Sequence, residues 1–212
     1  MRPGQRRLGY RICQFLCQTL FLLMFRGRVF GVRHVPRSGG VLLVCNHQSF
    51  FDPVLAGVGL RRECHYMARD TLFRQPLFRR LIQYLNAFPI KRGTADVGAV
   101  KETLRRLKAG ALITTFPEAT RTHDGSIGPM QPGVVLIARK ARVPIVPTLI
   151  WGAFEVWPRH RLLPRPGRIV VAYGEPLTPE QLDVQPDEEC IRIVRERILA
   201  LRATWQPVHC AS

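Results

Sequence analysis

The sequence predicts a single α/β domain with a central, largely parallel sheet flanked by helices and preceded by an N-terminal membrane-associating helix. Apolar runs rich in leucine and β-branched residues, at 40–45, 110–115 and 144–151, are typical of buried strands. Segments with apolar residues at helical spacing lie between them, and this alternation favours a parallel sheet. With 212 residues, 46% of them hydrophobic, the chain is long enough for one domain with a sizeable core.

The expected elements alternate along the chain between short strands and helices. Asp52 followed by Pro53 indicates a helix start, with Asp52 as the N-cap and proline at the first helical position. Residues 157–167, rich in proline and arginine, are predicted to form a loop. In all, we expect strands at 29–32, 40–45, 64–68, 110–115, 144–151 and 169–173, a short strand ending within 88–93, and helices after Asp52 and at 72–85, 96–108, 133–142 and 188–203.

The helix expected at 72–85 is basic and amphipathic, and its apolar side has two possible partners. These side chains either pack in the core or face a membrane together with the N-terminal segment, with arginines at the edge. We favour core packing for the whole set, which consists of Leu72, Phe73, Leu77, Phe78, Leu81 and Ile82.

The N-terminal segment, residues 1–28, combines basic and apolar residues. Arginines flank an apolar run at 12–25, which Gln14 and Gln18 interrupt and which is shorter than the about 20 residues that a spanning helix needs. We therefore expect a helix that lies in or dips into the cytoplasmic leaflet, anchored by the arginines. A buried core helix is one alternative. A signal peptide is another, although no small-residue cleavage site is visible.

The chain is strongly basic, with 32 Lys plus Arg against 15 Asp plus Glu and a formal net charge of +17. This excess favours anionic partners such as a phospholipid surface, the phosphates of CoA, an acidic carrier protein or nucleic acid. Few aromatic residues alternate with the basic runs and no nucleic-acid motif is present, so we expect no nucleic acid. The six cysteines and six histidines are dispersed, which indicates reduced thiols and no metal site.

The segment from Asn46 to Asp52 contains the best candidates for chemistry. His47 would lie at the carboxyl end of a strand, where ligand crevices form in open α/β sheets. An ideal helix would hold His47 and Asp52 about 140° apart, whereas a strand-to-helix turn brings them together. A carboxylate that accepts from one imidazole nitrogen leaves the other nitrogen to take a proton from a hydroxyl. Alternatively, Asp52 is only a helix cap and His47 a half-buried turn residue.

Two further segments place charged residues at strand ends. Within 116–125, Glu118 and Arg121 either hold each other in position or leave Arg121 to bind a phosphate through its planar fork of donors. A solvated ion pair between them is the alternative. Lys91 and Arg92, two adjacent cations beside a glycine, suit an anionic head group.

Together with the proline-punctuated strand at 143–148, and in this order, these segments resemble the signature blocks of the glycerolipid acyltransferase family. The resemblance spans residues 40–152. Ala119 stands where the family usually has glycine, and if this position needs a positive φ, alanine costs about 1 kcal/mol. The matching residues are Asn46, His47 and Asp52 in the N-H-x4-D block, and Phe116, Pro117, Glu118, Thr120 and Arg121 in the F-P-E-G-T-R block.

The resemblance implies an enzyme whose acyltransferase domain spans residues 29–212. It would move a fatty acyl group from acyl-CoA or acyl carrier protein to the free hydroxyl of a lysophospholipid. The implied acceptor is 1-acylglycerol-3-phosphate (lysophosphatidic acid), and the product is phosphatidic acid. His47, oriented by Asp52, would be the general base. The thioester is a co-substrate, and neither a cofactor nor a metal is implied. The implied location is the cytoplasmic face of a bacterial inner membrane, with monotopic or peripheral attachment.

The resemblance also implies a polar and basic substrate site. Arg121, with Arg92 or Lys91, would bind the phosphate of the acceptor, and Glu118 would hold Arg121 or contact the glycerol backbone. The implied substrate-binding residues are Glu118, Arg121, Arg92, Lys91, Asn46 and Thr120.

Other functions are also compatible with the sequence. One is an acyltransferase with a different acceptor, such as glycerol-3-phosphate, a lyso-ornithine lipid or another lysolipid. Another is a non-catalytic membrane-binding protein of the same fold, against which the joint presence of His47, Asp52, Glu118 and Arg121 argues. A serine hydrolase is disfavoured because no G-x-S-x-G elbow occurs.

Overall fold

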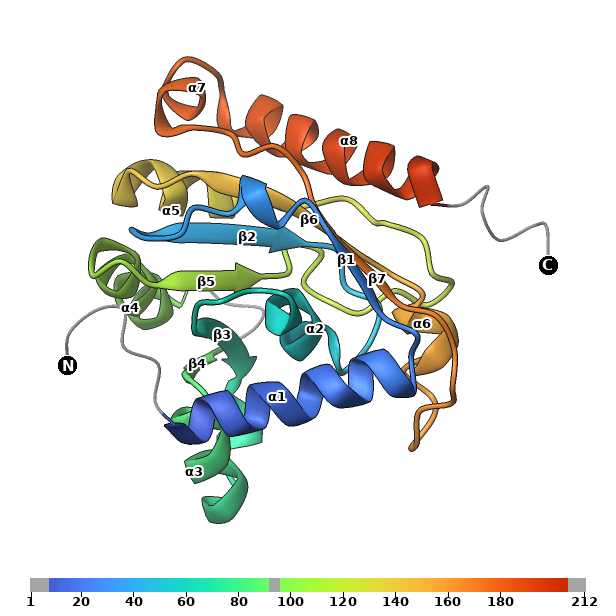
Figure 1. Ribbon diagram of the computed structural model, residues 1–212. Coiled ribbons are helices and arrows are strands. Elements are labelled where there is room, and N and C mark those ends of the chain that lie inside the picture. Colours follow the sequence, from blue (N-terminus) through green and yellow to red (C-terminus); the bar gives the residue numbers. More distant parts are fainter. Residues whose placement is uncertain (1–7, 92–95, 206–212) are drawn as a thin grey trace.

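The computed structural model describes residues 8–91 and 96–205. The strands are β1 (Arg28–Phe30), β2 (Val41–Cys45), β3 (Cys64–Arg69), β4 (Ala87–Ile90), β5 (Leu112–Thr115), β6 (Ile145–Trp151) and β7 (Val170–Tyr173). They form a seven-stranded sheet in the order β1-β7-β6-β2-β5-β3-β4 (Figure 1). Neighbouring strands are parallel except β6 and β7, which are antiparallel. The predicted α/β domain with a largely parallel sheet is thus confirmed.

Helices cover both faces of this sheet (Figure 1). They are α1 (Leu8–Leu23), α2 (Asp52–Val58), α3 (Pro76–Tyr84), α4 (Val97–Lys108), α5 (Gly133–Ala141), α6 (Ala153–Val156), α7 (Pro179–Asp183) and α8 (Asp187–Trp205), with 3-10 helices η1 (Val32–His34) and η2 (Asp70–Phe73). On one face, Leu42 and Val44 of β2 share a core with α4, α5 and α8. On the other face, Leu43 and Cys45 share a core with α1, α2 and α6. This alternation is the two-residue period of a strand that is buried on both sides.

Residues 72–85 do not form the single core helix that the sequence predicts. η2 ends at Phe73 and α3 begins at Pro76, because proline lacks the N–H that a continuing helix would use. No side chain of η2 or α3 is buried, and Leu77 is 82% exposed. The expectation of core packing for this segment is therefore wrong.

The short helices α6 and α7 are not among the predicted elements. They have 4 and 5 residues, which is too few for a periodic apolar pattern to show in the sequence. The start of α7 did carry a local signal, because Thr178 and Gln181 form a capping box.

The helix α1 packs on the protein through Tyr10, Phe21 and two glutamines, and turns its other large apolar side chains outward. Gln14 Nε2 donates to the carbonyl of Leu60 (2.7 Å) and Gln18 Nε2 to that of Val58 (2.7 Å), so both glutamines bind carbonyls at the end of α2. The exposed apolar side chains are Leu8, Ile12, Phe15, Leu16, Leu20, Leu22 and Leu23. The helix therefore packs on the core through Phe21 and leaves a larger apolar side uncovered. In the part of the chain that the structure describes, no helix is both long and apolar enough to cross a membrane.

The carboxyl ends of β2 and β5 lie side by side, with Val44 opposite Thr115 in the parallel ladder. The two segments that carry the strongest sequence motifs leave the sheet at these paired ends. The fold therefore brings together two motifs that lie far apart in the sequence.

Candidate active site

The turn that leaves β2 begins with a fully buried asparagine that ties it to a neighbouring strand. Asn46 Nδ2 donates to the carbonyl of Ile150 (2.9 Å), and its Oδ1 accepts from the N–H of Ile150 (2.8 Å). Ile150 lies on β6, which pairs with β2, so the amide continues the pairing past the end of β2. The structure thus gives Asn46 a part in holding the turn.

His47 and Asp52 are in direct contact, and both side chains are buried. His47 Nδ1 lies 2.7 Å from Asp52 Oδ2. The same oxygen accepts from the N–H groups of Gln48 (2.6 Å) and Ser49 (2.7 Å). Because a carboxylate only accepts, Nδ1 carries the proton and the lone pair is on Nε2. The turn therefore offers Nε2 as a proton acceptor.

Asp52 is the first residue of α2 and not its cap, since Phe51 precedes the helix. Its carboxylate turns back toward the residues before it, through the three bonds to His47, Gln48 and Ser49. The predicted N-cap is thus displaced by one residue, and capping alone does not describe these contacts. The N-terminus of α2 still favours a negative charge at this position.

The loop that follows β5 holds His47 on several sides. The N–H of His47 donates to Glu118 Oε1 (2.9 Å), and the carbonyl of His47 accepts from the N–H of Thr122 (2.9 Å). The ring of Phe116 stacks on the imidazole, with centroids 4.3 Å apart and planes inclined by 26°. Phe116 is not among the predicted site residues. Its position directly after a strand that neighbours β2 is the signal that points to it.

Glu118 joins two backbone N–H groups, because its second oxygen, Oε2, accepts from Gly128 (3.2 Å) while Oε1 accepts from His47. Burial raises the pKa of Glu118 above its ordinary value, and these two hydrogen bonds oppose the shift. Within the described residues Glu118 makes no ion pair with Arg121, so of the alternatives for these two residues the mutual contact is not present. The carboxylate instead ties the turn after β2 to the loop after β5.

The predicted cationic residues lie at different distances from this cluster. Arg121 is half-buried in the loop after β5, and the Thr120 hydroxyl donates to its carbonyl (3.2 Å). Lys91 is exposed beyond β4, three strands from β2, a lateral separation of about 14 Å at about 4.8 Å per strand. Arg92 lies outside the described residues. The structure therefore brings together His47, Asp52 and Glu118 and leaves Lys91 apart from them.

Comparison with known families fits this geometry. The family model described as Acyltransferase matches residues 26–151, which is more than half of the chain. The chain belongs to this acyltransferase family. Over 190 residues it is 26% identical to 1-acyl-sn-glycerol-3-phosphate acyltransferase of Bacillus subtilis (strain 168), an alignment that covers 89% of this chain and 92% of the relative.

Other relatives of this acyltransferase carry the same description. The 1-acyl-sn-glycerol-3-phosphate acyltransferase of Cocos nucifera is 31% identical over 169 residues, which cover 78% of this chain and 54% of the relative. The chain spans about half the length of several plant relatives. A crystal structure of the 1-acyl-sn-glycerophosphate (LPA) acyltransferase PlsC from Thermotoga maritima matches with a TM-score of 0.79 and 26% identity, covering 92% of this chain and 79% of that one.

This acyltransferase has alanine in a left-handed turn of its active-site loop. Ala119 has a φ of 62°, in a turn where its N–H donates to the carbonyl of Phe116 (3.1 Å) and the N–H of Thr120 donates to that of Glu118 (2.8 Å). The positive φ accounts for the glycine that the resemblance leads one to expect here, because glycine adopts this region without a Cβ clash. The strain lies between two residues of the matched motif.

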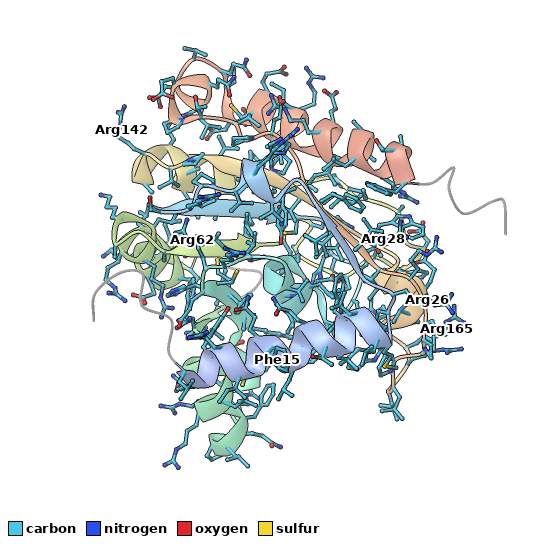
Figure 2. All side chains as sticks on the ribbon, in the orientation of Figure 1. Phe15, Arg26, Arg28, Arg62, Arg142 and Arg165 are labelled. Atoms are coloured by element: carbon cyan, nitrogen blue, oxygen red, sulfur yellow. The ribbon has the colours of Figure 1, made fainter. Side chains whose placement is uncertain are left out.

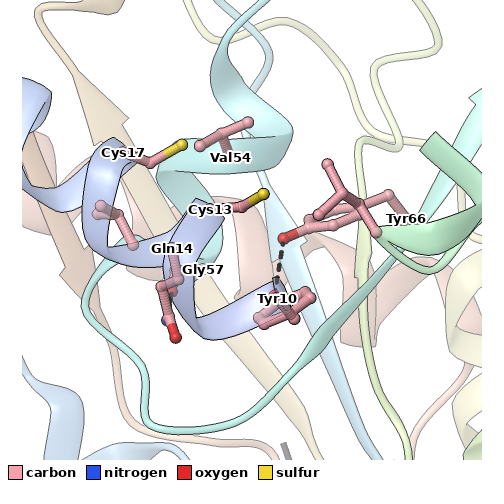
Figure 3. A pocket seen from close by; sticks show the side chains of 9 residues that line it. Tyr10, Cys13, Gln14, Cys17, Val54, Gly57 and Tyr66 are labelled. Atoms are coloured by element: carbon pink, nitrogen blue, oxygen red, sulfur yellow. Dashed lines mark hydrogen bonds between the residues drawn. The ribbon is translucent and has the colours of Figure 1, made fainter. Parts of the chain in front are cut away.

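A small cavity between α1, α2 and β3 is separate from the cluster of His47, Asp52 and Glu118 (Figure 3). Its volume is about 60 Å³, and its lining includes Tyr10, Cys17, Val54 and Tyr66. Burial raises the pKa of Tyr10 to about 12 and also raises that of Cys17, so this phenol and this thiol stay protonated. Ligand pockets usually measure roughly 300–1,000 Å³. The cavity is a packing gap and not a substrate site.

Proposed function

We propose that this acyltransferase transfers a fatty acyl group from a thioester, either acyl-CoA or acyl carrier protein, to the free hydroxyl of 1-acylglycerol-3-phosphate, giving phosphatidic acid. One observation carries the proposal: Asp52 Oδ2 fixes Nδ1 of His47 at 2.7 Å and leaves Nε2 for a substrate proton. The names of the relatives support the choice of acceptor.

The chemistry that this arrangement supports is direct acyl transfer. His47 Nε2 takes the proton of the acceptor hydroxyl as its oxygen attacks the thioester carbonyl carbon. The tetrahedral intermediate then collapses, the C–S bond breaks, and the imidazolium returns the proton to the leaving thiolate. Asp52 stabilises the imidazolium between these steps. No covalent acyl-enzyme is needed, and no metal or cofactor takes part.

The acceptor's phosphate is assigned to Arg121. This residue lies in a loop that Glu118 and Thr122 bind to the backbone of His47, so the loop holds a cation near the base. Within the described residues the Arg121 guanidinium forms no ion pair, and its planar donors match two phosphate oxygens. Lys91 and Arg92 remain predicted contributors to phosphate binding, and Thr120 remains a predicted substrate-binding residue. Glu118 and Asn46 serve the substrate indirectly, by holding the turn and the loop in register.

The test is acylation of lysophosphatidic acid by purified protein in mixed micelles, with each thioester offered in turn. His47→Ala is expected to lower kcat by at least about 10² with folding intact, because general-base catalysis contributes about 10²–10⁴. The matched control is His34→Ala. The His34 ring forms a hydrogen bond with the carbonyl of Tyr173 near the outer strand β1, so this variant is expected to keep wild-type activity.

Three outcomes separate the alternatives. Full activity of His47→Ala contradicts the mechanism. A wild-type enzyme that acylates glycerol-3-phosphate, a lyso-ornithine lipid or another lysolipid, but not lysophosphatidic acid, keeps the chemistry and changes the acceptor. A wild-type protein that acylates no acceptor with either thioester identifies a non-catalytic membrane-binding protein of this fold.

We also propose that α1 holds the enzyme on an anionic membrane surface, at the cytoplasmic face of the inner membrane. Its outward side is apolar and its inward glutamines are bound to α2, which is the arrangement of an interfacial helix. Arg11 in its first turns and Arg26 and Arg28 after its end are exposed and can bind lipid phosphates.

Surface substitutions test this attachment better than deletion of the helix. Phe21 and Phe25 are 2% and 1% exposed, so removing residues 1–25 would open the core. Phe15→Ser with Leu16→Ser leaves the buried side intact and is expected to reduce sedimentation with anionic vesicles about tenfold or more, because each leucine- or phenylalanine-sized side chain contributes about 1.5–3 kcal/mol when buried. Unchanged sedimentation contradicts anchoring by α1.

A further inference from the structure

Residues 157–167, in the loop between α6 and β7, carry two adjacent leucines near their middle, and both leucines face solvent. Leu162 is 94% exposed and Leu163 is 78% exposed. Isolated surface leucines are ordinary, but an adjacent and largely exposed pair at a loop tip indicates an apolar binding surface.

The loop is held in shape by its own hydrogen bonds. Trp157 Nε1 donates to the carbonyl of Arg161 (3.1 Å), and the N–H of Arg161 donates to that of Pro158 (3.1 Å). At the other end, the N–H of Arg165 donates to the carbonyl of Val156 (3.0 Å). These hydrogen bonds fix the backbone at the base of the loop, so the loop loses little conformational entropy when its tip binds a partner.

The flanks of this tip are basic. Arg159, Arg161 and Arg165 are all exposed, and residues 157–167 contain no aspartate or glutamate. Arginines beside a pair of leucines match a surface with phosphates above an apolar layer, since a long basic side chain reaches up to the phosphate level while its neighbours insert. An acidic protein would satisfy the arginines but would leave the leucines without an apolar partner.

The loop lies next to the exposed side of α1 and next to the active-site turn. The N–H of Gly167 donates to the carbonyl of Met24 just after α1 (3.4 Å), close to Leu22 and Leu23, which are 60% and 80% exposed. Figure 2 shows Arg165 beside this end of α1, together with Arg26.

The base of the loop also contacts the turn that carries His47. Ser49 Oγ donates to the carbonyl of Trp157 (2.9 Å), and the rings of Phe50 and Trp157 meet edge to face at 6.1 Å. A surface that holds the loop tip would therefore hold the active-site turn near it.

We propose that residues 157–167 are a second membrane-contacting element, in which Leu162 and Leu163 insert into an anionic bilayer while Arg159, Arg161 and Arg165 bind its phosphates. Together with α1 it would fix the orientation of the enzyme, because one helix alone leaves rotation about its axis free. This inference rests on the proposed function, because it assumes that the enzyme acts at a lipid surface. Its test does not depend on that function, because vesicle binding is measured without catalytic turnover.

The experiment is sedimentation of the full chain with vesicles of phosphatidylglycerol and phosphatidylethanolamine. Leu162→Ser with Leu163→Ser is expected to lower the partition coefficient about tenfold or more, since two apolar side chains lose their burial. Leu162→Trp with Leu163→Trp is expected to bind at least as well as wild type, because tryptophan prefers the interface. The control is Val184→Ser, 79% exposed after α7 on the opposite face of the sheet, which is expected to change nothing.

Wild-type partitioning of the double serine variant would overturn the inference. If that variant also loses binding to acyl carrier protein, the loop is a protein-docking site instead. Acylation of lysophosphatidic acid in detergent micelles is measured in parallel. If the proposed function is wrong, neither wild type nor any variant has this activity. If the loop proposal is wrong, the leucine substitutions leave vesicle binding unchanged.

Discussion

At the scale of single residues, the Asp52 carboxylate is bound on one side only. Oδ2 accepts three hydrogen bonds, whereas Oδ1 is buried with no hydrogen-bond partner in the described part of the chain. A buried polar atom without a partner usually costs about 1–3 kcal/mol. The fold tolerates this cost where it also orients the imidazole of His47, as expected for a functional site.

Asp52→Asn separates the orientation of the His47 imidazole from the stability of the turn. An amide in this position can donate to Nδ1 and thus favour the other imidazole tautomer, which places the proton on Nε2. We expect kcat to fall by about 10² or more with little change in KM. Steady-state kinetics with circular dichroism as a folding control measures this, and a variant with wild-type kcat would show that Asp52 is structural only.

Ala119→Gly relieves the left-handed strain in the active-site loop. Alanine at a φ of 62° carries a Cβ clash that glycine lacks. The free energy of unfolding is expected to rise by about 1 kcal/mol, reduced somewhat by the greater chain entropy of glycine in the unfolded state. Urea unfolding followed by tryptophan fluorescence measures the change. A less stable variant would show that the turn does not carry this strain.

At the scale of elements, α8 reaches the candidate active site through the loop after β5. Arg195 donates from Nε to the carbonyl of Gly128 and from Nη2 to that of Ile127, both at 2.9 Å. The N–H of Gly128 in turn donates to Glu118, which accepts from the N–H of His47. A helix near the end of the chain thus helps to fix the position of Glu118.

Arg195→Met removes the two donors of this connection. We expect kcat to fall about threefold to tenfold with KM for the thioester little changed, because a small displacement of the base slows the chemical step. Arg195→Lys, which can bind only one carbonyl well, should be intermediate. The control is Arg192→Met on the same helix, whose partners are Glu189 and Glu196. Equal activity of both methionine variants would contradict a positioning role.

The helix α4 supplies a pH-dependent contribution to stability. The hydrogen bond from Arg105 to Glu102 is the main cause that lowers the pKa of Glu102 from 4.5 to about 2, and Arg106 adds to it. Between these values the unfolded chain binds more protons than the folded one, so this contribution is present above pH 4.5 and is lost as the pH falls toward 2.

Glu102→Gln should therefore flatten the acid dependence of the thermal midpoint. The variant is expected to be less stable than wild type above pH 4.5 and to approach it toward pH 2. Thermal unfolding across this range is the measurement, with Glu188→Gln, an exposed glutamate of α8, as the control. A parallel pH dependence of the Glu102→Gln variant and wild type would contradict the assignment.

At the scale of the whole molecule, charge and apolar surface act together. The chain carries a net charge of +17, and the exposed side of α1 and the 157–167 loop lie on the same side of the sheet (Figure 1). Exposed charges act over about 8 Å at physiological salt. Charge therefore favours approach to an anionic surface, while the leucines and phenylalanines hold the protein there.

Binding to vesicles is accordingly expected to have two components. Raising the salt concentration should weaken wild-type binding to anionic vesicles strongly and leave a smaller, salt-resistant fraction from the apolar contacts. Neutral phosphatidylcholine vesicles should show only that fraction. Sedimentation across a salt series measures both, and salt-independent binding to anionic vesicles would show that the basic surface plays no part.

The sequence determined what depends on neighbours along the chain. Strand and helix periods, the proline after Asp52 and the five-residue spacing from His47 predicted the α/β class and the turn in which His47 contacts Asp52, because periodicity and turn chemistry act within a few residues. Only the tertiary structure decided which side of each helix is covered. α3 has no buried side chain although its pattern suits a core, and α1 faces inward with Phe21 and its two glutamines.

The tertiary structure also decided which motifs meet. Pairing of β2 with β5 places Phe116 against the imidazole of His47 and turns Glu118 toward the backbone, away from the ion pair that its sequence spacing to Arg121 suggested. Strand order is set by the joint burial of distant segments, and no local pattern encodes it. The sequence thus determined the chemical groups and the local turn, while the sheet decided their partners.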